Sequence, residues 1–278
     1  MQFVFKSDWF LNIYMNKIIF ILLLLVSLSS CSEYQKALKS EDIELKYTAA
    51  KNKYNAGKYG KAIRLFEQIA PAYRGKSQSE EMFYMYSQAY YKTKQYYLAG
   101  YQFNSFASSF PKSEKAEEAT FLSAKSYSML SPEYSLDQTD TDKAINKMQE
   151  FINKYPSSAY LEEANTIVKG LQNKLEKKAF EIAKQYNTIS DYKAAIKALD
   201  NFIIDFPGTP YKEKALYYKL DSSYKLAINS VPSKMEERLK FAKTAYESLV
   251  KFNANTEYKR EADDMLAKID KDLQQFQK

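Results

Sequence analysis

One spacing recurs along this chain and constrains its fold more than any other feature: a proline follows an alanine after twelve residues in three separate segments. The three pairs are Ala99 and Pro111, Ala144 and Pro156, and Ala195 and Pro207. An aromatic residue stands directly before each of these prolines. Because proline cannot continue a helix and moves the preceding residue out of the helical region, each pair predicts a helix that ends at the same place. The chain is therefore expected to repeat one helical unit.

Residues 47–66 contain the first copy of this unit. Tyr59, Ala62 and Phe66 follow the turn residue Gly57 at spacings that place them on one face of a helix. The pattern resembles the tetratricopeptide repeat, in which a small alanine lets two antiparallel helices approach while aromatic residues fill the space beside it. The resemblance implies an all-α fold for residues 44–278, a right-handed superhelix of about five helix-turn-helix units with 10–11 helices. The packing alanines of these units are expected at Ala62, Ala99, Ala144, Ala195 and Ala242.

The spacing between units is unequal, and three segments account for the extra residues. A loop is expected at about 131–141, a long helix at about 160–187, and a second loop around Pro232. From Glu257 onward, apolar residues alternate at spacings of four and three, which predicts a capping helix over the last unit. The polar residues Ser113, Ser158 and Thr209, just after the prolines, are expected to cap the helices that follow.

The N-terminal segment contains the only cysteine of the chain. Lys17 precedes an apolar run at 18–28, which is too short to span a bilayer and is typical of a secretory signal peptide. The residues Leu28, Ser29 and Ser30 then lead to Cys31 and resemble a bacterial lipobox. The resemblance implies a signal peptide at 1–30, with Met15 as the expected true start, and a lipidated Cys31 followed by a spacer at 31–43. Two or more acyl chains anchor a protein stably, so attachment to a membrane through lipid is expected.

Composition argues against several classes of function. The chain contains no histidine, which removes the commonest general base and the commonest metal ligand. Its net charge is +7, but basic and acidic residues alternate along the chain, so no nucleic-acid-binding stripe is indicated. The acidic loop at 137–142 lacks the central glycine and final glutamate of a calcium loop. We therefore expect no enzyme activity, no metal site and no cofactor other than the covalent lipid.

Tyrosine is abundant, with 25 residues, and most are expected to pack between helices. In the tetratricopeptide register, however, some residues of the first two units would line the concave surface. Tyrosine is rigid and amphipathic, so such a surface suits an extended peptide or one with an aromatic end. The alternative is that these residues also belong to the core or to the solvated surface. The candidate substrate-peptide groove consists of Tyr47, Lys51, Tyr54, Tyr84, Gln88 and Tyr91.

The chain resembles the outer membrane protein assembly factor BamD family in four features. These are the lipobox, the repeats, the long helix, and the junctions at which an aromatic residue and a proline are followed by serine or threonine. The resemblance extends from Cys31 to the C-terminus. It implies a lipid-anchored subunit of the β-barrel assembly machinery, on the outer membrane and facing the periplasm. The expected partners are a BamA-type outer-membrane barrel, through its periplasmic domains, and nascent β-barrel proteins. On that picture the N-terminal units hold substrate and the C-terminal units hold the barrel.

The sequence is also compatible with two other interpretations. One is a different periplasmic tetratricopeptide adaptor, such as the coordinator associated with the Tol–Pal system, although that family typically lacks a lipobox. The other is a glycan-binding lipoprotein of the SusD type, although those chains are much longer and carry large inserts.

Overall fold

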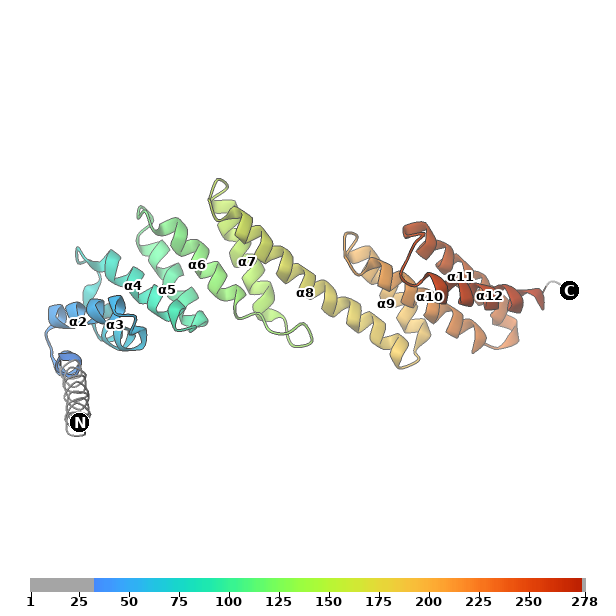
Figure 1. The fold of residues 1–278 in the computed structure, drawn as a ribbon, viewed down its shortest axis with the longest axis horizontal. Coiled ribbons are helices and arrows are strands. Elements are labelled where there is room, and N and C mark those ends of the chain that lie inside the picture. Colours follow the sequence, from blue (N-terminus) through green and yellow to red (C-terminus); the bar gives the residue numbers. More distant parts are fainter. Residues whose placement is uncertain (1–32, 277–278) are drawn as a thin grey trace, which may run out of the picture. The chain divides into compact units, whose positions relative to one another are not determined.

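The computed structural model describes residues 33–276, whose regular structure is entirely helical (Figure 1). Cys31 and the predicted signal peptide lie outside the described residues. The chain divides into two compact units. The first holds the described residues up to Leu130 together with Glu150–Tyr160, and the second holds Ser131–Gln149 and the residues from Leu161 onward. The prediction of an all-α, tetratricopeptide-like fold is confirmed: in the described part of the chain, eleven helices, α2 to α12, follow a short helical segment at 33–39.

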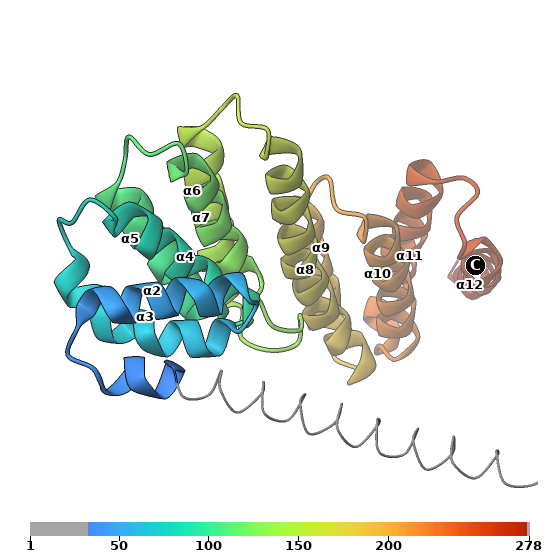
Figure 2. The same ribbon diagram turned by 60° about the vertical axis from the view of Figure 1, so that its left-hand side comes forward.

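The first unit consists of antiparallel helix pairs. Consecutive helices contact each other along the series α2 to α6, and Figure 2 shows α2 and α3 lying side by side. The C-terminal part of α7 completes this unit. The helices are α2 (Ile43–Asn55), α3 (Tyr59–Tyr73), α4 (Ser79–Lys92), α5 (Tyr96–Ser109) and α6 (Ala116–Ser128), while α7 (Thr139–Lys154) is divided between the two units.

Within a pair, the same tight turn recurs. Gly57, Lys94 and Ser190 adopt positive φ angles of 69°, 59° and 65°, respectively. In each turn the next amide donates a hydrogen bond to the carbonyl five residues back, as from Gln95 to Tyr90 at 2.9 Å, which is the Schellman arrangement for ending a helix. Only the first turn uses glycine, which tolerates this conformation best. The turn predicted at Gly57 is confirmed.

The packing alanines predicted from the repeats are all buried. Each is 0% exposed, which lets the two helices of a pair approach closely. Large aromatic residues fill the remaining space, and Phe66, Phe103 and Phe151 are also 0% exposed. The buried alanines are Ala62, Ala99, Ala144, Ala195 and Ala242.

The second unit continues the pattern with a long helix and a final capping helix. The long helix α8 matches the one predicted at about 160–187. In α12, Ala262, Met265 and Ile269 are buried in the last core cluster, which confirms the capping helix. The helices are α8 (Leu161–Thr188), α9 (Tyr192–Asp205), α10 (Lys212–Ile228), α11 (Pro232–Phe252) and α12 (Lys259–Gln274).

The expected helix caps at the proline junctions were wrong. Ser113 Oγ accepts a hydrogen bond from the Lys115 amide, but α6 begins only at Ala116, so the serine stabilises the turn before the helix. Its hydroxyl also donates to Glu80 Oε1 at 2.6 Å, at the second position of α4. Ser158 bonds in the same way to Glu117 at the second position of α6. The junction serines therefore tie one repeat to the start of the previous one.

Residues 33–39, expected as part of a polar spacer, form a short helical segment instead. Tyr34 is 4% exposed and Ala37 is 1% exposed, and both belong to the core cluster of the first unit. In Figure 2 this segment, in blue, lies beside α3. The folded structure thus begins close to the predicted lipidation site.

Candidate functional site

The six residues predicted to form a peptide groove lie on α2 and α4, the first helices of the first two repeats. These helices contact each other directly. The residues are less open than the sequence suggested: Tyr47 is only 6% exposed, and Tyr54, Tyr84, Gln88 and Tyr91 are half-buried. The predicted register therefore places them on a shared surface, but much of their ring area is used in packing. We call this set, with Glu81 and Glu118, the inner tyrosine surface.

A carboxylate links the two helices at one end of this surface. The Tyr47 hydroxyl donates to Glu81 Oε2 at 2.6 Å, and Lys51 Nζ donates to Glu81 Oε1 at 2.7 Å. These two hydrogen bonds lower the pKa of Glu81 below its usual value. Glu81 thus stays ionised at neutral pH, and half of its side chain remains exposed to solvent.

Tyr84 occupies the middle of the surface. Gln88 Nε2 donates to the Tyr84 hydroxyl at 2.9 Å, and the Tyr84 ring packs against Phe106 with centroids 5.4 Å apart. Burial raises the pKa of Tyr84, and the Glu118 carboxylate on α6 raises it further. Burial also raises the pKa of Tyr54, and the same Glu118 adds to the effect. Glu118 therefore lies close to tyrosines of both repeats.

Tyr91 contributes mainly to packing within its own repeat. Its ring meets Tyr96 edge-on at 5.7 Å and Phe103 at 6.4 Å. Tyr54 packs against Tyr59 in the equivalent way, at 5.4 Å. These two tyrosines thus pack mainly within their own helix pairs, and only the exposed parts of their rings are available for binding.

Sequence reasoning missed the acidic members of the surface. Glu81 and Glu118 stand in the first turns of α4 and α6, where an acidic residue is usually explained by the helix dipole. Lys115 pairs with Glu118 at 3.2 Å and lies 5.6 Å from the centre of the Tyr84 ring. The surface therefore carries phenol, carboxylate, amide and ammonium groups, which suits recognition of a polypeptide with polar and aromatic features.

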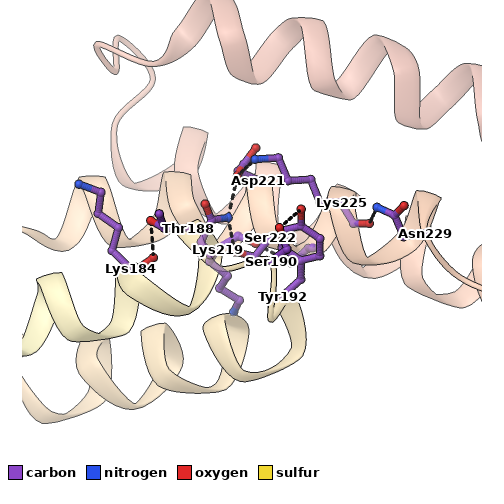
Figure 3. Close-up of polar contacts among 11 residues, drawn as sticks. Lys184, Thr188, Ser190, Tyr192, Lys219, Asp221, Ser222, Lys225 and Asn229 are labelled. Carbon is purple, nitrogen blue, oxygen red and sulfur yellow. Dashed lines mark hydrogen bonds and ion pairs between the residues drawn. The ribbon is translucent and has the colours of Figure 1, made fainter.

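The second unit has a separate polar cluster between α8 and α10 (Figure 3). Asn187 is 9% exposed, and its Nδ2 donates to Asp221 Oδ2 at 2.7 Å and to Ser222 Oγ at 2.8 Å. Lys225 forms an ion pair with Asp221 at 2.7 Å, and Figure 3 labels both residues. The cluster satisfies its own polar groups, so it holds the two helices together and does not offer a vacant binding site.

A small pocket of about 290 Å³ lies between α9, α10 and α11. Phe241 is 44% exposed at its edge, and Lys219 stands 5.5 Å from the centre of that ring. Lys219 also pairs with Asp200 at 2.6 Å. This pocket combines an exposed aromatic ring with charged groups and is the second candidate contact surface.

Between residues 33 and 276, no group of three or more His, Cys, Asp or Glu side chains is placed to hold a metal ion. In the same range, no helix is both long and apolar enough to cross a membrane.

Comparison with known proteins supplies the family. The family described as YfiO, outer membrane lipoprotein, matches residues 39–239. The outer membrane protein assembly factor BamD of Caulobacter vibrioides is 22% identical over 67% of this chain and 61% of its own length. The BamD of Pasteurella multocida is 21% identical over 77% of this chain and 86% of its own length. The putative BamD of Aquifex aeolicus is 26% identical over 86% of this chain and 78% of its own length.

The family match begins shortly after the predicted lipidation site and covers well over half of the chain. It includes all of the inner tyrosine surface. The resemblance predicted from the repeats and junctions is confirmed: this chain belongs to the YfiO family of outer membrane lipoproteins, together with relatives that are BamD assembly factors.

Proposed function

We propose that this chain is a lipid-anchored, non-enzymatic scaffold of the outer-membrane β-barrel assembly machinery, facing the periplasm. The observation that carries the proposal is the family match over residues 39–239, which includes helices of both units. The relatives are named as outer membrane protein assembly factors, and the matched region of the present chain consists of helical repeats.

In this proposal the inner tyrosine surface holds the C-terminal segment of a nascent β-barrel protein. Such a segment ends in a carboxylate and often in an aromatic residue, as the family resemblance implies. Lys51 is 40% exposed and offers an ammonium group to the carboxylate, while the half-buried rings of Tyr54 and Tyr84 offer aromatic contact. The partner barrel of the BamA type would then contact the second unit, where Phe241 is exposed beside the small pocket.

The substrate proposal is tested with a fluorescent peptide that carries a C-terminal phenylalanine and with the full lipidated protein in mild detergent. Lys51→Glu should weaken peptide binding by about fivefold or more, because it replaces attraction to the carboxylate with repulsion. Lys92→Glu makes the same change in charge at the exposed end of α4 and serves as the control. Equal affinities of the Lys51 variant and the parent protein for the peptide would contradict the proposal that this surface binds the substrate.

The anchor proposal depends on Cys31. Cys31→Ala should release a folded protein into the soluble periplasmic fraction, because a chain without its acyl groups has no stable hold on the bilayer. The measurement is fractionation of cells that lack the barrel partner. Retention of the variant in the membrane fraction of those cells would show that something other than the lipid anchors it.

A further inference from the structure

The first unit contains a cavity that the family role does not explain. It has a volume of about 890 Å³ and lies between the segment at 33–39, the start of α3 and the α4–α5 turn. It is separate from the inner tyrosine surface, since none of the six predicted groove residues lines it. Its lining includes Tyr34, Lys58, Gly60, Lys61, Arg64 and Glu67.

Tyr34, which lines this cavity, carries a buried polar group that has no partner. Tyr34 is 4% exposed, and its hydroxyl is the buried side-chain oxygen or nitrogen without a hydrogen-bond partner in the described part of the chain. Buried hydroxyl groups in folded proteins nearly always have a partner. A ligand that accepts a hydrogen bond from Tyr34 would supply it.

The start of α3 provides further donors to the same cavity. The N-cap residue Lys58 makes no side-chain capping bond, and the first turn contains no acidic residue. Among the described residues, the amides of Tyr59 and Gly60 have no hydrogen-bond acceptor. A Cβ atom added at Gly60 would meet nothing within 4 Å, so the backbone there is open to a ligand. Uncapped amides and the helix dipole together favour an anion at such a place.

Charge in the cavity favours an anion as well. Lys61 lies 5.2 Å from the centre of the Tyr34 ring, and neither Lys58 nor Arg64 has an ion-pair partner within residues 33–276. The one acidic group in the lining, Glu67, accepts a 2.8 Å hydrogen bond from Tyr90 on the neighbouring helix. Three cations therefore face one carboxylate that is already engaged.

The position of the cavity identifies the source of the anion. Cys31 precedes Tyr34 by three residues, so its Cα lies within about 11 Å of the Tyr34 Cα in any conformation. If Cys31 carries the acyl groups, as the proposed function holds, the cavity is held at the membrane surface, where phosphate headgroups are concentrated. We propose that the cavity binds the phosphate of an anionic phospholipid headgroup and so fixes the orientation of the first repeat on the membrane.

The test uses the full lipidated protein in a neutral detergent and calorimetric titration with short-chain phospholipids below their micelle-forming concentration. Dihexanoyl-phosphatidylglycerol should bind saturably, while dihexanoyl-phosphatidylcholine and inorganic phosphate should each bind about tenfold more weakly or less. Equal binding of the two lipids would overturn the recognition of an anion. Equal binding of inorganic phosphate would assign the cavity to free phosphate and overturn the lipid proposal.

Variants locate the binding. Replacing Lys61 and Arg64 together by Gln should weaken phosphatidylglycerol binding by about tenfold or more. Replacing Lys268 and Lys271 by Gln removes the same charge from α12 and should change the affinity by less than about twofold. Equal losses in the two double variants would show a general effect of charge and would contradict the proposal.

Tyr34→Phe separates ligand binding from folding. The melting temperature without lipid should not fall, because the lost hydroxyl has no partner, whereas the affinity for phosphatidylglycerol should fall severalfold. Unchanged affinity would show that the hydroxyl does not contact the ligand. Neither barrel nor peptide takes part in these titrations, so their outcome is independent of the substrate and partner proposals.

Discussion

The hydroxyl of Tyr47 on α2 and Oε2 of Glu81 on α4 lie 2.6 Å apart and join the first two repeats. Tyr47 is 6% exposed, so its hydroxyl depends on this carboxylate as a partner. Lys51 reaches the other oxygen of the same carboxylate from an exposed position. The relationship gives Glu81 a structural role in addition to its place on the inner tyrosine surface.

A double-mutant cycle measures the Tyr47–Glu81 bond. Tyr47→Phe and Glu81→Ala should show a coupling of about 1–2 kcal/mol in the free energy of unfolding, as for a hydrogen bond to a charged group. The parallel cycle with Lys51→Ala and Glu81→Ala should give about 0–1 kcal/mol, because that pair is exposed. Urea unfolding of the six proteins is the measurement. A larger coupling energy for Lys51 than for Tyr47 would contradict the prediction that the Tyr47–Glu81 bond is the stronger of the two.

Alkaline pH should destabilise the first unit through its tyrosines. Burial raises the pKa of Tyr73 to about 12, with the charge and hydrogen bond of Glu44 adding to the effect. Burial likewise raises the pKa of Tyr47, Tyr84 and Tyr90 above the usual 10.0. A pKa raised in the folded state contributes stability that is complete below the unfolded pKa and is lost as pH rises through the folded pKa.

The thermal unfolding temperature should accordingly be constant up to about pH 9 and should fall between about pH 10 and about pH 12. Tyrosinate absorbance and far-ultraviolet circular dichroism, followed together, should change in the same range. Tyr73→Phe removes one of the groups and should move the loss of structure to higher pH. Ionisation of every tyrosine near pH 10, with the helical signal intact, would contradict the prediction.

Two glycines in helices should respond to alanine in opposite directions. A Cβ on Gly100 in α5 would lie 3.0 Å from the buried ring of Tyr127, and the Gly100 carbonyl accepts a 2.7 Å bond from Ser123. Gly100→Ala should therefore destabilise the protein by about 1–3 kcal/mol. Gly170 in α8 is exposed with nothing within 4 Å, so Gly170→Ala should stabilise it by about 0.5–1 kcal/mol. The denaturant midpoint of each variant shows whether its stability rises or falls. Changes in the same direction for both variants would contradict the close packing of α5 and α6.

The polar cluster of the second unit predicts a similar contrast between two asparagines. Asn187→Ala would leave the fully buried Ser222 hydroxyl and Asp221 without their shared donor, at a cost of about 1–3 kcal/mol. Asn229→Ala removes an exposed bond to the Lys225 carbonyl and should cost about 0.5 kcal/mol or less. Calorimetric melting temperatures compare the two. A smaller loss for Asn187 would mean that solvent replaces its bonds.

The sequence predicted the repeats well because their signals are local. The alanine of each second helix, the long helix and the capping stripe follow directly from helical periodicity and from where proline can stand. All five alanines are fully buried, and α8 spans Leu161–Thr188 against a predicted range of about 160–187.

The junctions and the site were harder because they depend on contacts between repeats. A serine before a helix looks the same in sequence whether it caps that helix or bonds to Glu80 of the previous repeat. In the same way, periodicity placed Tyr47 on the correct face but could not show that it is buried against Glu81. Spacing fixes the direction of a side chain, whereas its depth depends on residues far away in the chain.

The assignment to outer-membrane assembly is tested most directly by capture of the lipidated protein from outer membranes in mild detergent, with mass spectrometry of what co-purifies. An assembly role predicts recovery of a large β-barrel with periplasmic repeats, in stoichiometric amount. Recovery of Tol–Pal components or of a glycan importer in its place would contradict the assembly role, although the helical scaffold and its family would stand.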